Sequence, residues 1–179
     1  MIGRRPLLAR LVSLAGLSGL AGCGFHPVYM PTESGDAGTA QREMAAVFID
    51  NIGERSGQLL RQALQERFER GETGVARRYT LTVSYGIGGE GIAVLTDNNV
   101  TRIRVIGDAK WYLVAQDPGR TRLAAGHAHA VDGFNILNQQ YFFSDLSNED
   151  SQKRMADAIA DQIAIQVAAW FRGHAASAG

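Results

Sequence analysis

The feature that most constrains the fold is a long stretch in the middle of the chain where apolar and polar residues alternate. Residues 101–115 read TRIRVIGDAKWYLVA, and one face collects the apolar side chains Ile103, Val105, Ala109, Trp111 and Leu113. As a β-strand, this stretch would span about 50 Å, far more than a usual strand. A strand of this kind keeps its register by burying its apolar face. We expect a bulge or bend at Gly107, near its middle.

Further strands are predicted on both sides of this stretch. Residues 78–87, RYTLTVSYGI, place five large side chains on one face, namely Tyr79, Leu81, Val83, Tyr85 and Ile87. After a turn at Pro118-Gly119, residues 122–134 return as RLAAGHAHAVDGF. One face of this returning strand is unusually small (Ala124, Gly126, Ala128 and Ala130), which suits a helix lying close against it. The shorter run at 45–52, AAVFIDNI, predicts a fourth strand.

Two segments have helical periodicity. In residues 55–71 the apolar residues Leu60, Leu64 and Phe68 recur every four positions, with Ser56 as a predicted N-cap and Gly71 as the predicted end. Towards the C-terminus, a helical stripe contains Met155, Ile159, Ile163, Val167, Trp170 and Phe171. This second helix is predicted to start at Ser147, with Asp150 in its first turn, and to end at Gly173.

The predicted order is β-α-β-β-β-α, which gives an α+β fold. We expect a two-layer sandwich, in which one mostly antiparallel four-stranded sheet carries two helices on one face. The single domain is predicted to span residues 44–173 and to be followed by a disordered tail at 174–179. A hydrophobic content of 45% is enough for a core in a chain of 179 residues, and no internal repeat or second domain is visible.

The N-terminus reads as a secretory signal. Arg4 and Arg5 precede an apolar stretch at 7–20 that is interrupted by Arg10 and is too short for a membrane-spanning helix. The sequence LAGC at 20–23 resembles the bacterial lipobox, in which the cysteine is lipidated and becomes the mature N-terminus. We therefore predict a lipoprotein signal peptide at residues 1–22 and a lipidated Cys23. The alternatives are an ordinary signal peptide or a buried structural cysteine.

Lipidation of Cys23 has consequences for location and stability. Two or more acyl chains anchor a protein stably in a membrane. We expect this covalent lipid on Cys23 and no other cofactor. Residue 24 is Gly rather than Asp, which by resemblance to enteric lipoproteins favours the periplasmic face of the outer membrane. Residues 23–43, rich in Gly, Ser, Thr and Pro beyond Met30, are predicted to form the lipidated N-terminus and a flexible tether. Because Cys23 is the only cysteine, no disulfide is expected.

The charge balance and the short motifs argue against several functions. With 18 basic and 18 acidic residues, the chain shows no electrostatic sign of nucleic-acid binding. The segment GIGGEG contains G-x-G-x-x-G at Gly86, Gly88 and Gly91, but a dinucleotide site needs a helix to begin there. Residues 92–95 instead lead into the turn TDNN, so a flexible β-hairpin region is favoured.

His127 and His129 lie two residues apart on a predicted strand and so share one face. A zinc site would need a third ligand, and Asp132 falls on the opposite face. Two histidines that are satisfied by hydrogen bonds, or that simply lie at the surface, are therefore favoured over a metal site. No nucleophile and base are organised by a recognisable motif, and we predict that the protein is not an enzyme.

The remaining chemical signal is basic. The outward face of the central strand and the start of the next strand carry Arg102, Arg104, Lys110, Arg120 and Arg122, and Arg77 and Arg78 could join them. Guanidinium groups suit bidentate contacts with phosphates, so this face is a candidate binding surface for anionic groups. The alternative is an ordinary solvated sheet face.

Several segments together resemble one family. They are GCGFHPVY at the lipobox, VTRIRV and AKWYLV in the long strand, GFN at 133–135, and YFFSDLSNEDSQKRMADAIADQI from residue 141. In this order, along the predicted β-α-β-β-β-α pattern, they resemble the LptE family of lipopolysaccharide (LPS) assembly lipoproteins, in its alphaproteobacterial form. The resemblance covers essentially the whole mature chain.

The resemblance implies a partner and a ligand. LptE proteins plug the lumen of the outer-membrane β-barrel LptD and assist delivery of LPS to the outer leaflet. Their LPS binding through basic residues carries over to Arg102, Arg104, Lys110, Arg120 and Arg122 as candidates. The alternative is a periplasm-facing lipoprotein that serves as a lipid-binding module or as an accessory of an ABC transporter.

Overall fold

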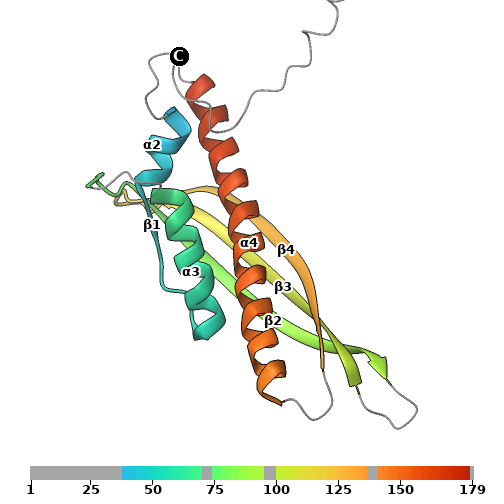
Figure 1. The fold of residues 1–179 in the computed structure, drawn as a ribbon. Coiled ribbons are helices and arrows are strands. Elements are labelled where there is room, and N and C mark those ends of the chain that lie inside the picture. Colours follow the sequence, from blue (N-terminus) through green and yellow to red (C-terminus); the bar gives the residue numbers. More distant parts are fainter. Residues whose placement is uncertain (1–37, 70–73, 95–99, 137–140, 178–179) are drawn as a thin grey trace, which may run out of the picture.

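The computed structural model describes residues 38–69, 74–94, 100–136 and 141–177. Four strands form one sheet in the order β1-β2-β3-β4, in which β1 is parallel to β2 and the other neighbours are antiparallel. The helices α3 and α4 cover one face of this sheet (Figure 1). The predicted fold class is confirmed. The strands are β1 (Val47–Ile49), β2 (Tyr79–Val94), β3 (Val100–Ala115) and β4 (Arg122–Asn135), and the helices are α2 (Thr39–Ala45), α3 (Glu54–Glu69) and α4 (Tyr141–Ser177).

The long strand β3 keeps its register through Gly107, so the predicted bulge is absent there. Gly107 pairs with Ile87 of β2 and Ala130 of β4 without any break in register. A Cβ atom at Gly107 would lie 2.9 Å from Cγ of Met155 and 3.0 Å from Cδ1 of Ile159, both on α4. The glycine is therefore explained by the close approach of α4 to the sheet.

The irregularities of the sheet lie elsewhere. The β2–β3 register shifts around Ala93, and the β3–β4 register shifts between Leu113 and Val114. Both positions are near strand ends, where an extra residue disturbs few ladder hydrogen bonds.

Helix α4 is longer than predicted. It contains 37 residues, about 55 Å of helix, so it begins before Ser147 and continues past Gly173. The predicted end at Gly173 is wrong, because residues 174–177 continue the helix. One glycine costs a helix interior only about 1 kcal/mol, and beyond it the His174 ring lies against the Trp170 ring of the preceding turn, with 4.1 Å between the ring centroids.

Helix α2 occupies residues that were predicted to belong to the flexible tether at 23–43. Ala40 and Met44 are buried, and they provide the apolar contacts that hold this short helix against α4. Glu43 accepts a hydrogen bond from the Tyr79 hydroxyl at 2.9 Å and forms an ion pair with Arg78 at 2.8 Å. The packed domain therefore begins before residue 44, and the element order is α-β-α-β-β-β-α.

The other element boundaries differ by smaller amounts. β1 is only three residues long, and α3 begins at Glu54, so Ser56 lies inside the helix rather than at its N-cap. Glu54 has φ of +65°, which makes a sharp entry into α3. Gly71, the predicted end of this helix, lies outside the described residues, as do the predicted signal peptide, Cys23 and most of the tether.

The core lies between the sheet and the helices. The predicted apolar faces of β2 and β3 point into it, as does the α4 stripe, in which only Trp170 is partly exposed. The small face of β4 lets α4 approach, because a Cβ at Gly126 would lie 2.6 Å from both Cζ2 of Trp111 and Oε1 of Gln166. Arg67 of α3, with only 15% of its side chain exposed, joins the helices through Asp161 at 2.6 Å and Asp157 at 3.3 Å on α4.

Candidate binding face

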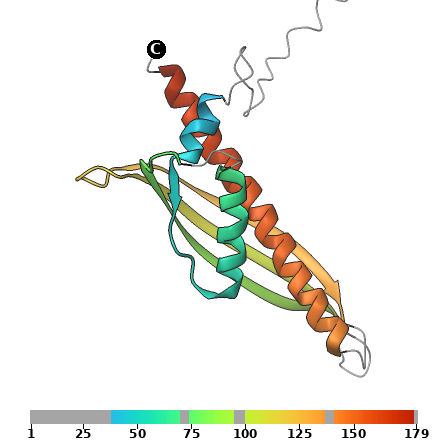
Figure 2. The same ribbon diagram turned by 60° about the vertical axis from the view of Figure 1, so that its left-hand side comes forward.

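The face of the sheet opposite to α3 and α4 has none of the described helices over it in either view (Figures 1 and 2). Because side chains alternate along a strand, β3 directs its apolar residues to the core and its charged residues to this open face. The basic residues Arg102, Arg104 and Lys110 all lie on it, as predicted. Phe48, Tyr112 and Val131 add exposed apolar surface to the same face.

Arg102 and Arg104 lie near the end of the sheet where β3 begins. Arg104 is opposite Glu90 of β2, and the two side chains form an ion pair with 2.8 Å between Nη1 and Oε1. Both side chains are about half exposed, so this pair contributes at most about 1 kcal/mol to stability.

Arg120 and Arg122 lie at the opposite end. Arg120 is in the β3–β4 turn, with φ of +48°. Arg122 opens β4, and its guanidinium carbon lies 5.1 Å from the centre of the Tyr112 ring, a cation–π contact on the open face. About twelve residues of β3 separate Arg102 from the partner of Arg122, or roughly 40 Å. The five candidate residues therefore share a side of the molecule but form two separate groups, with Lys110 between them.

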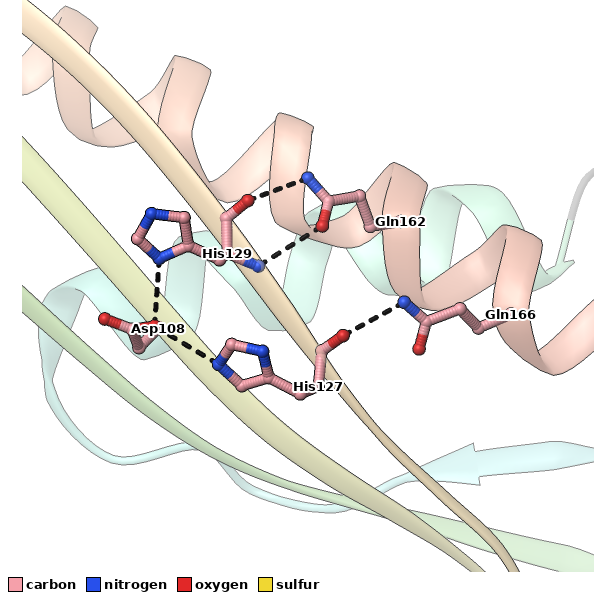
Figure 3. Close-up of polar contacts among 5 residues, drawn as sticks. All are labelled: Asp108, His127, His129, Gln162 and Gln166. Atoms are coloured by element: carbon pink, nitrogen blue, oxygen red, sulfur yellow. Dashed lines mark hydrogen bonds and ion pairs between the residues drawn. The ribbon is translucent and has the colours of Figure 1, made fainter.

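The middle of the face contains a carboxylate and two histidines (Figure 3). Oδ1 of Asp108 lies 2.9 Å from Nδ1 of His129 and 3.2 Å from Nε2 of His127. The hydrogen bond from His129 is the main reason that the pKa of Asp108 lies below its usual value. The predicted shared face and satisfied state of the two histidines are confirmed. In the part of the chain that the structure describes, no cluster of three or more His, Cys, Asp or Glu side chains could hold a metal ion.

Arg77 and Arg78 do not join this face. Arg77 donates to the carbonyl oxygens of Ala45 and Val47, each at 2.9 Å, and pairs with Glu69 at 2.7 Å. The hydrogen bond to Glu43 of α2 raises the pKa of Arg78. These two arginines hold the short elements α2 and β1 in place.

Helix α4 covers the middle of the free edge of β4, a feature that the sequence analysis missed. Gln162 accepts a hydrogen bond from the His129 amide at 3.2 Å and donates one to the His129 carbonyl at 2.9 Å (Figure 3). Gln166 donates to the His127 carbonyl at 3.0 Å and accepts from the Trp111 indole at 3.0 Å. Two side-chain amides thus replace a neighbouring strand, which protects the edge from pairing with another chain. The sequence signal for this contact was the four-residue spacing of Gln162 and Gln166, which places both on one side of a helix.

The GIGGEG segment continues β2. Gly86 to Gly91 pair with Asp108 to Ile103 of β3, so no helix begins there and the dinucleotide interpretation is excluded. All the residues from Gly86 to Val94 belong to β2, which pairs antiparallel with β3, in agreement with the β-hairpin that the sequence suggested.

Comparisons with known proteins agree with this architecture. The family model described as "LptE: Lipopolysaccharide-assembly" matches residues 43–167. The chain belongs to the LptE family. This LPS-assembly lipoprotein family is non-enzymatic, in agreement with the expectation from the sequence. A comparison with curated protein sequences gives no match.

Three solved structures show the same fold. A putative lipoprotein from Caulobacter crescentus CB15 is 18% identical, with a TM-score of 0.61 over 75% of this chain and 96% of that one. The rare lipoprotein B from Shewanella oneidensis is 13% identical, with a TM-score of 0.51 over 69% and 93%. A minor lipoprotein from Acinetobacter baumannii is 14% identical, with a TM-score of 0.50 over 70% and 92%. In the described part of this LptE-family chain, no helix is long and apolar enough to cross a membrane.

Proposed function

We propose that this LptE-family protein is an outer-membrane lipoprotein, anchored through a lipid on Cys23, that plugs an LptD-type β-barrel and assists it in assembling LPS into the outer leaflet. The observation that carries the proposal is the family match over residues 43–167. This range includes the whole sheet, α3 and most of α4, so the full framework of the domain is that of an LPS-assembly protein.

The open sheet face supports the proposed contact with a barrel. The interior of a large outer-membrane barrel is polar, so a plug needs a surface that mixes charges with modest apolar area. The open face carries the Arg104–Glu90 ion pair, the separate charges of Lys110 and Asp108, and the exposed ring of Tyr112. Contacts of this kind form many hydrogen bonds without requiring a continuous apolar interface.

LPS contact is proposed for the two basic groups of this face. Arg102 and Arg104 form one group, Arg120 and Arg122 form the other, and Lys110 lies between them. Phosphate groups accept paired hydrogen bonds from guanidinium groups, and removal of one such contact typically costs about 1.5–3 kcal/mol, or roughly 10- to 150-fold in affinity. The roughly 40 Å between the groups predicts that each acts independently.

The test begins with a mild-detergent pull-down of the native lipoprotein and mass spectrometry of the proteins that co-purify. A stoichiometric outer-membrane barrel is the expected result. An inner-membrane transporter subunit in its place would contradict the plug and favour the accessory role in an ABC transporter.

Charge reversal then separates LPS contact from barrel contact. The double variant Arg102→Glu and Arg104→Glu is compared with the matched control Lys153→Glu, which reverses an exposed charge on α4. We expect the arginine variant to lower the affinity for purified LPS at least about tenfold while the barrel still co-purifies, and the control to change neither. Loss of the barrel with unchanged LPS affinity would reassign these arginines to the protein interface.

A further inference from the structure

A cavity of about 400 Å³ lies on the helix-covered side of the sheet, at the end where β2 finishes and β3 begins. Its walls are apolar and come from β2, β3, β4 and the residue that follows β4, namely Ile87, Ile103, Val105, Phe134 and Ile136. The first turns of α4 form the remaining side, and Figure 2 shows this end of α4 extending past the lower end of α3. The volume is within the range of small-molecule sites in proteins.

One glycine of β2, Gly89, makes room for this cavity. Gly88 and Gly89 line it, and neither has a positive φ that would require glycine. A Cβ at Gly89 would point to the core side of the sheet and lie 3.3 Å from Cγ2 of Ile103. Glycine in a strand interior forfeits packing and conformational entropy. This segment is therefore shaped to leave space under α4.

The rim is polar, and no basic group is present among the described residues that line the cavity. Asp145, Asn148 and Gln152, all on α4, supply its polar side chains. Asn and Gln amides both donate and accept hydrogen bonds, and a carboxylate only accepts. A hydroxyl or amide group suits this rim, whereas a phosphate or carboxylate would be repelled by Asp145. The basic residues Arg102 and Arg104 alternate with Ile103 along β3, so they lie on the other face of the sheet.

We propose that this cavity binds a single linear acyl chain whose uncharged hydroxyl or amide group lies at the α4 rim. The apolar walls recognise the chain, and the rim selects against an anionic head. The site is separate from the barrel contact and from the basic face, so the inference stands or fails independently of the proposed function.

The test uses the full chain with Cys23→Ser, kept soluble by an amphipathic polymer, and 1-dodecanol as the probe. Methyl NMR signals of Ile87, Ile103 and Ile136 report on the cavity, and the core residue Ile163 serves as an internal control. We expect dodecanol to shift the three cavity methyls and not Ile163. Affinity should rise about fourfold per added methylene, from octanol upwards, until the cavity is filled.

Two matched glycine variants test where the acyl chain binds. Gly89→Leu projects a side chain into the cavity and is expected to weaken dodecanol binding at least about tenfold. Gly86→Leu, three residues earlier on β2, projects into open space on the other face, where a Cβ meets nothing within 4 Å, and should leave the affinity essentially unchanged. Equal effects of the two variants would overturn the proposal, as would the absence of cavity-methyl shifts.

The head-group selectivity of the rim is tested by changing the charge of the probe and of Asp145. Dodecanoate should bind more weakly than dodecanol, and Asp145→Asn should reduce the difference. Equally strong binding of dodecanoate to the unaltered chain would overturn the assigned head-group selectivity. Displacement of dodecanol by an N-acylglucosamine, which offers amide and hydroxyl groups, or by a monoacylglycerol, which offers hydroxyl groups alone, would support the site and identify the source of the chain, and displacement by neither would overturn it. Retention of the barrel in the pull-down alongside a failed titration would remove this inference and leave the proposed function intact.

Discussion

The contact between Gly126 and Trp111 gives the sharpest prediction about stability. In the Gly126→Ala variant, the new Cβ would lie 2.6 Å from Cζ2 and 2.7 Å from Cε2 of the indole, and 2.6 Å from Oε1 of Gln166. Non-bonded carbon atoms prefer separations of about 3.5–4.0 Å. The indole ring is rigid and only 3% of Trp111 is exposed, so the ring has no free space to move into.

Relief of this clash has a calculable cost. Overpacking of a core costs about 1–3 kcal/mol. Displacement of Gln166 would also break its 3.0 Å bonds to the Trp111 indole and the His127 carbonyl, at roughly 1 kcal/mol each. We expect Gly126→Ala to lower the free energy of unfolding by about 3–5 kcal/mol, and the melting temperature by roughly 6–20 °C for a chain of this size.

The assay is thermal unfolding followed by circular dichroism, with Gly86→Ala as the matched control. A Cβ at Gly86 meets nothing within 4 Å, and this glycine has no positive φ, so the control should be about 0.4–1 kcal/mol more stable. Trp111→Phe removes the crowded ring atoms, so Gly126→Ala should cost much less in the Trp111→Phe background. Equal melting temperatures for the two alanine variants would refute the reasoning, and so would an unchanged cost of Gly126→Ala in that background.

Three further predictions concern single side chains. Burial raises the pKa of Tyr85 to about 12, and its hydroxyl has no partner among the described residues. The stability that this shift provides is present below about pH 10 and is lost between about pH 10 and 12, so Tyr85→Phe should reduce alkaline unfolding without destabilising the protein at about pH 7. Gln162→Leu removes two hydrogen bonds to His129 and should cost about 2 kcal/mol in chemical denaturation, whereas Gln58→Leu on the exposed side of α3 should be near neutral. The lowered pKa of Asp108 contributes stability above about pH 4 that is lost on acidification, so Asp108→Asn should flatten the acid limb of a pH titration of stability; an unchanged limb would contradict this contribution.

The sequence by itself determined which residues face the core. Strand alternation and the helical stripe are local properties, because successive side chains point to opposite faces of a strand and recur about every 3.6 residues in a helix. For this reason Leu81, Trp111 and Ile163 were assigned correctly to the core, and Arg102 and Arg104 to the open face. The family was likewise visible in the order of short motifs, and the match over residues 43–167 confirms it.

The ends of elements depended on tertiary contacts. Gly173 is a local stop signal that costs a helix only about 1 kcal/mol, and α4 continues past it, with the His174 ring centred 4.1 Å from the centre of the Trp170 ring. Helix α2 has weak sequence signals of its own and is held by burial of Met44 and by the contacts of Glu43 with Tyr79 and Arg78. No pattern within residues 23–43 contains that information.

Only the tertiary structure decided what the glycines and glutamines do. Gly107 admits α4 to the sheet, whereas Gly89 leaves a cavity beneath it, although both look alike as glycines within strands. Gln162 and Gln166 close the edge of β4 because α4 crosses the sheet at that position. These roles depend on the distance between layers that are far apart in the sequence, whereas the sequence records only the local direction of each side chain.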